Sequence, residues 1–158
     1  MSNTYSQLYT HYVFVVQNRL SLIQIEWEEI LFKYLSGIVE KQGHKVYAIN
    51  GIPDHVHIFV SMNPKQSPSE LVFNAKRSSS LWINEKRLSL GKFSWQEGFA
   101  AFSYGKSQVD SVVKYIKGQK EHHHKKTFNE EYLEFLKLYG IEYNEKYIFK
   151  PVNVDIKG

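Results

Sequence analysis

Two histidines separated by one residue, His55 and His57, are the side chains of this sequence best suited to chemistry. They alternate with apolar residues from Val56 onward, which is the period-two pattern of a β-strand. Residues two apart on a strand face the same side, roughly 6.5–7 Å apart along the backbone. The two imidazoles could therefore converge on one metal ion, or they could be partly exposed polar positions of a strand.

A second candidate pair, Tyr115 and Gln119, lies on a predicted helix further along the chain. Residues four apart on a continuous helix lie one above the other, so the phenol and the amide would share a side. An apolar stripe runs beside them, formed by Val109, Val112, Val113 and Ile116. Tyr115 could be a nucleophile at the edge of this stripe, or an ordinary packing residue of an amphipathic helix.

The order of predicted elements is strand, helix, strand, strand, helix, strand, followed by further helices. The strands are expected at 8–16, 45–50, 56–60 and 99–104, and the first helix at 27–39. A capping box that begins at Ser67, with Pro68 as the first helical residue, starts the second helix. This order predicts an α+β, ferredoxin-like split βαβ fold, an antiparallel four-stranded sheet with two helices on one face plus a C-terminal tyrosine-bearing helix. The other sheet face is left free for a site.

The tyrosine-bearing helix is predicted to start at a capping box that begins at Ser107. Gly118 inside it costs about 1 kcal/mol relative to alanine, and it either permits a close approach of backbone or DNA or marks a bend. A short fourth helix over 130–139 should end at Gly140. We predict a single domain over 1–158, with its core at about 5–130 and a helical tail at 130–150.

The sequence of 158 residues contains no cysteine, which excludes disulfide scaffolds, thiolate zinc sites, iron–sulfur clusters and cysteine nucleophiles. No apolar run approaches the ~18 residues that span a bilayer, and the first residues lack the pattern of a secretory signal. We therefore expect a soluble cytoplasmic protein that does not associate with a membrane.

Positive charge is concentrated in one segment. Residues 65–126 hold twelve of the twenty Lys and Arg against five acidic residues, a net +7, whereas the rest of the chain carries −3. This asymmetry is expected of a polyanion-binding face, although a solvated basic surface is the alternative. The 24 aromatic residues favour single-stranded nucleic acid, whose unpaired bases stack on rings. The candidate DNA contacts are Arg19, Lys76, Arg77, Lys114 and Lys117.

Two motifs together carry a family resemblance. The run Pro53-Asp54-His55-Val56-His57-Ile58-Phe59-Val60 and the later run Val113-Lys114-Tyr115-Ile116-Lys117-Gly118-Gln119 resemble the small HUH transposases with one catalytic tyrosine. The segments 10–14 and 95–104 are also similar to that group, so the resemblance covers roughly residues 5–130. These enzymes mobilise insertion sequences as single strands. The His-apolar-His triplet is weak alone, but it is specific in combination with the Tyr-x-x-x-Gln helix.

The resemblance implies a set of roles. His55, His57 and Gln119 would hold a divalent metal, Mg²⁺ or Mn²⁺, and Tyr115 would attack DNA to leave a 5′-phosphotyrosine. The expected substrate is single-stranded DNA marked by a hairpin, the expected assembly is a homodimer, and no nucleotide cofactor is implied. In this family the tyrosine helix can serve the partner's histidines.

Other interpretations remain open from the sequence alone. A domesticated relative, of the REP-associated type, would keep the nuclease chemistry without mobilising DNA, and a third alternative is a non-catalytic single-strand-binding module. Asp54 could orient a histidine as an acceptor, or be a turn residue. The run His122 to His124 is better explained by a basic patch at a helix end than by a metal site, because successive helical residues point 100° apart.

Overall fold

The computed structural model describes residues 4–122, 130, 133–134 and 136–137. Its four strands form one antiparallel sheet; they are Tyr9–Val15 (β1), Lys45–Ile52 (β2), His55–Ser61 (β3) and Ala100–Tyr104 (β4). Their order in the sheet is β2-β3-β1-β4, so β1 and β3 are central and β2 and β4 lie at the edges. The predicted α+β fold with an antiparallel four-stranded sheet is confirmed.

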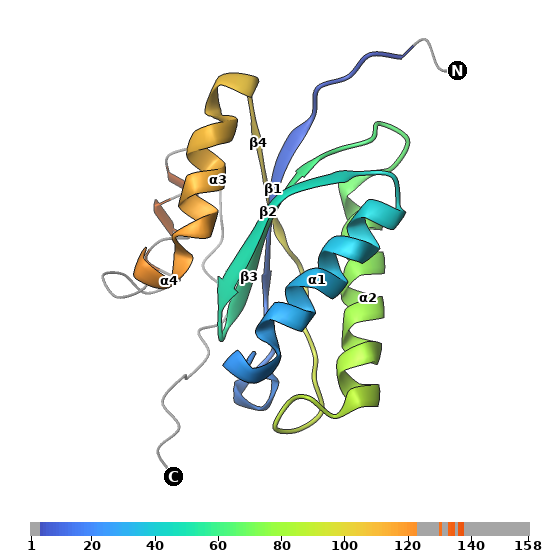
Figure 1. The fold of residues 1–158 in the computed structure, drawn as a ribbon, viewed down its shortest axis with the longest axis vertical. Helices are drawn as coiled ribbons and strands as arrows, with labels where there is room; N and C mark the ends of the chain where they lie inside the picture. Colours follow the sequence, from blue (N-terminus) through green and yellow to red (C-terminus); the bar gives the residue numbers. More distant parts are fainter. Residues whose placement is uncertain (1–3, 123–129, 131–132, 135, 138–158) are drawn as a thin grey trace.

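Two long helices cover one face of this sheet, α1 (Ile25–Lys41) and α2 (Pro68–Lys86) (Figure 1). The Ser67 hydroxyl accepts a hydrogen bond from the Glu70 amide at 3.1 Å, which confirms the capping box that starts α2. Alternate residues of β1 and β3 point into the core beneath these helices. The core includes Tyr12, Phe14, Ile58 and Val60 from the strands and Leu31, Leu35, Leu71 and Ala75 from the helices.

The opposite face carries α3 (Val109–Lys117) and the short α4 (Gln119–His122) (Figure 1). Val112 and Ile116 of α3 are buried against Ala48 and Phe59 of the sheet. Leu136 is also buried, beside a strand cluster formed by Val13, Val15, Ala100 and Phe102. The face that the sequence predicted to be free is therefore partly covered, and the covering helix is the one that bears Tyr115.

The boundaries of α3 differ from the prediction at both ends. A 3-10 turn, η2 (Lys106–Gln108), precedes α3, and its cap is Gly105, whose amide donates to Gln108 Oε1 at 3.0 Å; the expected capping box at Ser107 is wrong. Gly118 is the C-cap that ends the helix, and its amide donates to the Lys114 and Tyr115 carbonyls at 3.1 and 3.2 Å. Gln119 begins α4, so Tyr115 and Gln119 do not share one continuous helix.

Parts of the predicted C-terminal segment lie outside the described residues. Residues 130, 133–134 and 136–137 are helical, as expected for the fourth helix, and its predicted end at Gly140 lies outside the described residues. His123 and His124 also fall outside the described range, as do Lys125 and Lys126. Within the part of the chain that the structure describes, no helix combines the length and apolar character needed to cross a membrane.

Candidate active site

His55 and His57 are both buried on the face of β3 that lies under α3. Their ring centroids are 4.8 Å apart at an interplanar angle of 77°. The alternating residues Val56 and Ile58 enter the core on the opposite face. The period-two pattern therefore does bring the two imidazoles to one place.

Asp54 fixes the orientation of His55. The Asp54 Oδ1 atom lies 2.7 Å from His55 Nδ1, so the imidazole donates its Nδ1 proton to the carboxylate. The Nε2 atom of His55 then carries a lone pair, and it lies 3.4 Å from Gln119 Oε1. A carboxylate–histidine pair of this kind is a frequent support for a metal ligand. Asp54 also lies in the turn between β2 and β3, and its carbonyl accepts from the Val16 amide, so both sequence interpretations hold.

His57 is oriented by a residue that the sequence reasoning did not single out, His11 of β1. The His11 Nε2 and His57 Nδ1 atoms are 2.7 Å apart, and the two rings stack at 4.9 Å. Burial, helped by the nearby His55, lowers the pKa of His11 to about 3, so His11 is neutral at ordinary pH. A neutral His11 can accept the Nδ1 proton of His57, which leaves His57 Nε2 as the atom a metal would use.

The pairing of β1 with β3 is the information from which the role of His11 could have been predicted. In the antiparallel register Val13 pairs with His57 and His11 with Phe59, so His11 and His57 are diagonal neighbours on one face. A polar residue within the apolar run of β1 is also unusual for a central strand. Neither observation selects His11 until the partner strand and its register are known.

Tyr115 lies beside these histidines. Its ring centroid is 5.9 Å from that of His57, at an interplanar angle of 88°, and 6.3 Å from that of His11. The packing of Val112 and Ile116 against the sheet fixes this position, because Tyr115 follows the same stripe along α3. The structure therefore places the predicted nucleophile together with all three predicted metal ligands.

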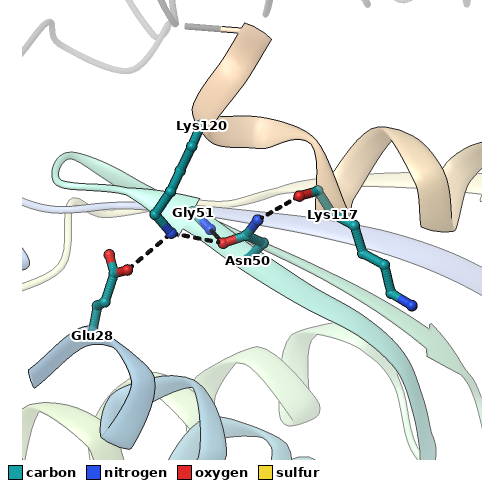
Figure 2. Close-up of polar contacts among 5 residues, drawn as sticks. All are labelled: Glu28, Asn50, Gly51, Lys117 and Lys120. Atoms are coloured by element: carbon teal, nitrogen blue, oxygen red, sulfur yellow. Dashed lines mark hydrogen bonds and ion pairs between the residues drawn. The ribbon is translucent and has the colours of Figure 1, made fainter. Parts of the chain in front are cut away.

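A polar contact group holds the junction between α3 and α4 at the β2 edge of the sheet (Figure 2). Asn50 of β2 donates to the Lys117 carbonyl at 3.0 Å and accepts from Lys120 Nζ at 3.3 Å. Lys120 Nζ also lies 2.9 Å from Glu28 Oε1 of α1. We call Glu28, Asn50, Lys117 and Lys120 the edge clamp. It fastens the segment that carries Gln119 to two elements of the same chain.

The predicted DNA contacts are divided between the two layers of the fold. Lys114 and Lys117 have exposed side chains on α3, in the layer of the histidines. Arg77 is exposed on α2, in the opposite layer, and Arg19 is partly exposed in the 3-10 turn η1 (Arg19–Ser21) after β1. DNA contact by these four residues stays a prediction.

Lys76 makes contacts within the protein itself, and its predicted contact with DNA also stays a prediction. Its ammonium donates to the carbonyls of Gln96, at 2.8 Å, and Gly98, and lies 5.7 Å from the centre of the Phe14 ring. Burial lowers its pKa to about 8, against the opposing effect of Glu97. The side chain thus joins α2 to the loop before β4, on the far side of the sheet from the histidines.

We expect Lys76→Met to lower the free energy of unfolding by roughly 1–3 kcal/mol, because two carbonyls lose a charged hydrogen-bond donor. Urea unfolding followed by circular dichroism measures this change. The neighbouring exposed Arg77→Met is the matched control and should change stability by less than about 0.5 kcal/mol. Equal stability of the two variants would contradict a structural role for Lys76.

The sequence matches the family model described as transposase IS200-like over residues 4–119. The chain therefore belongs to the IS200-like transposase family, whose members cleave and transpose DNA. A search of curated proteins finds no match.

Solved structures with this fold include transposases. A proposed transposase from Deinococcus radiodurans R1 is 18% identical, with 75% of this chain and 95% of that chain covered and a TM-score of 0.59. A REP-associated tyrosine transposase bound to a REP hairpin is 15% identical, with 78% of this chain and 73% of that chain covered and a TM-score of 0.58. At these identities the likeness shows the shared fold.

Proposed function

We propose that this transposase cleaves and rejoins single-stranded DNA through Tyr115, with a divalent metal held by His55, His57 and Gln119. The observation that carries the proposal is the convergence of these four side chains, from two separate parts of the sequence, on one sheet face. The family supplies the DNA-cleaving class of reaction, and the convergence supports the specific residues.

The donor set suits a divalent ion whose ligand shell is completed by DNA. Among the described residues no group of three or more His, Cys, Asp or Glu could hold a metal ion, so the set depends on the amide oxygen of Gln119. Two imidazoles and one amide are neutral and favour Mn²⁺ over the harder Mg²⁺. When bound, the ion would polarise the scissile phosphate and stabilise the negative charge that develops on it.

Tyr115 would supply the nucleophile. Its phenol oxygen forms a bond to phosphorus, the bond from phosphorus to the 3′-oxygen breaks, the phenol proton is released, and the departing oxygen gains a proton to become a 3′-hydroxyl. The 5′-phosphotyrosine keeps the energy of the phosphodiester. A second 3′-hydroxyl can then attack it and release Tyr115, so joining needs no nucleotide cofactor.

The proposed substrate is a single strand that carries a hairpin, bound by a homodimer. Exposed lysines on α3, Lys114 and Lys117, lie in the layer of the histidines and suit phosphate contacts. The structural neighbour bound to a REP hairpin supports a folded hairpin as the element recognised. It equally supports the alternative of a REP-associated nuclease that no longer mobilises DNA, which would use the same residues on a different set of hairpins.

The test combines purified protein with Mn²⁺ and a pool of single-stranded hairpin DNAs with varied flanks, which include the DNA beside the protein's own gene. A denaturing gel detects a covalent protein–DNA adduct, and peptide mass locates the modified residue. We expect an adduct on Tyr115 with single strands and none with duplex. An adduct on another tyrosine overturns the site assignment, and tight metal-independent binding without any adduct favours the binding module.

We expect Asp54→Ala to raise the Mn²⁺ concentration for half-maximal cleavage by roughly 10- to 100-fold, because His55 loses the group that fixes its orientation and proton. Excess Mn²⁺ should restore most of the rate. A titration of cleavage against Mn²⁺ checks this, with the exposed Glu85→Ala as control. An unchanged Mn²⁺ dependence would show that Asp54 serves the turn alone.

A further inference from the structure

The sheet face that carries His57 extends to a pocket at the other end of the strands. Four residues after His57 on β3, Ser61 pairs with Lys45 of β2 and with Tyr9 of β1, and all three belong to one row across the sheet. At 3.3 Å per residue the row lies ~13 Å from His57. A pocket of about 450 Å³ opens beside it.

The lining of this pocket suits a phosphodiester. The residues that line it include Lys45 and Lys65, the hydroxyl-bearing Thr4, Ser6 and Ser61, and Asn63, and none of the described residues that line it is acidic. Lys45 and Lys65 are both exposed. Two ammonium groups together with several neutral hydrogen-bond donors favour an anion, and this lining offers a cation no carboxylate to pair with.

One residue that lines the pocket, His44, is buried and belongs to a hydrogen-bond network. The Asn63 amide donates to His44 Nδ1 at 2.8 Å, so His44 carries its proton on Nε2 and donates it to Gln66 Oε1 at 2.6 Å. Gln66 in turn donates to Gln42 Oε1 at 2.8 Å. The Lys65 amide is tied to Asn63 Oδ1 at 3.0 Å. This network fixes the loop that carries Lys65 before any ligand is present.

Two tyrosines neighbour residues that line the pocket, since Tyr47 contacts Lys45 and Tyr9 pairs with Ser61. Lys45 Nζ lies 5.1 Å from the centre of the Tyr47 ring, and the rings of Tyr47 and Tyr9 are 5.8 Å apart. Both rings lie 6.1 Å from Phe59, which fixes them on the sheet, and both remain partly exposed. A ring beside positive charge is the combination on which unpaired bases stack.

We propose that this region, the flank pocket, binds the single-stranded DNA that flanks the cleaved phosphate. Lys45 and Lys65 contact its phosphates and Tyr47 stacks on a base. The ~13 Å to His57 corresponds to roughly four nucleotides at the 3.4 Å spacing of a stacked strand, and to fewer in an extended one. The assignment rests on the proposed function, since it takes the cleaved phosphate to lie at His57.

The experiment compares Lys45→Ala/Lys65→Ala with the charge-matched control Lys33→Ala/Lys86→Ala, whose lysines are exposed on α1 and α2. Both pairs are made in full-length Tyr115→Phe protein, which prevents cleavage. Affinity is measured for hairpin oligonucleotides whose 5′ and 3′ single-stranded flanks are lengthened separately, one nucleotide at a time, over a range of salt concentrations. Tyr47→Leu is a third variant, which keeps an apolar contact with Phe59 and removes the stacking face.

With a long flank on one side, we expect the pocket variant to bind roughly tenfold more weakly than the control. The slope of its log affinity against log salt concentration should be shallower by about 1.4, because two single-strand phosphate contacts are lost. Tyr47→Leu should weaken the same complexes by at least fivefold at unchanged slope. With short flanks all variants should bind alike. Equal affinities and slopes at every flank length overturn the flank pocket.

The adduct assay with wild-type protein runs in parallel and separates the two proposals. An adduct on Tyr115 together with equal binding of both pairs overturns the flank pocket and leaves the proposed function intact. A flank-dependent loss of binding without any adduct keeps the pocket as a single-strand site and overturns the nuclease chemistry.

Discussion

Cleavage of single-stranded DNA by the Tyr115→Phe variant should be slower than that of the wild type by roughly four orders of magnitude. The substitution removes one oxygen and keeps the ring that lies 5.9 Å from His57, so the packing of α3 is preserved. Since the hydroxyl is required only for bond formation, affinity for the uncleaved strand should stay within about twofold. Single-turnover cleavage and equilibrium binding measured on the same oligonucleotide separate the two effects.

Tyr34→Phe is the matched control for this change. Tyr34 stacks on Trp82 at 4.4 Å in the helical layer, far from the histidines, and its phenylalanine variant keeps that contact. We expect its cleavage rate to equal that of the wild type. Adduct formation by Tyr115→Phe at a normal rate would assign the nucleophile to another side chain.

The second large effect is expected for His57→Ala, which removes one of the two proposed imidazole ligands and leaves His11 beside a cavity. Cleavage should fall by at least roughly 10³-fold, the scale of losing a group that stabilises transition-state charge. Removal of metal from the wild type with a chelator should give the same loss, and added Mn²⁺ should reverse it. The Mn²⁺ electron paramagnetic resonance signal reports binding directly, without reference to activity.

Gln119→Ala tests the third proposed metal ligand and is compared with His57→Ala. The amide oxygen is a weaker ligand than imidazole, so its removal should weaken Mn²⁺ binding less than the loss of His57 does. Unchanged Mn²⁺ binding in His57→Ala, with a normal circular dichroism spectrum, would contradict the ligand assignment. A variant that fails to fold is recognised by the same spectrum.

Local patterns were sufficient to predict most of the fold. The alternation from His55 to Val60, the helical spacing of α1 and the Ser67–Glu70 cap each depend on residues within one or two turns of one another. They gave the correct element order, and with it the sheet that brings Tyr115 over the two histidines. The assignment of His55, His57, Tyr115 and Gln119 to one site came instead from the family resemblance, because periodicity alone left the histidines and the tyrosine with ordinary structural explanations.

Features that depend on tertiary contacts were missed or wrong. His11 becomes a partner of His57 only through the β1–β3 register. The pattern of α2 alone does not predict that Lys76 is partly buried, because the carbonyls that its ammonium contacts belong to a loop about twenty residues later in the sequence. The helix break at Gly118 has a local cause in glycine, but the edge clamp that holds the next residues joins Lys120 to Glu28 of α1 at the β2 edge of the sheet.

The edge clamp also has a consequence for a mixture of two inactive variants of this protein. Because Asn50 and Glu28 hold α4 on its own chain, we expect the proposed nucleophile and the proposed metal ligands of one site to come from a single polypeptide. An equimolar mixture of Tyr115→Phe and His57→Ala should therefore remain inactive in the adduct assay, whereas exchange of tyrosine helices between protomers would restore activity. In genetic terms the two alleles fail to complement, and every active copy must be intact by itself.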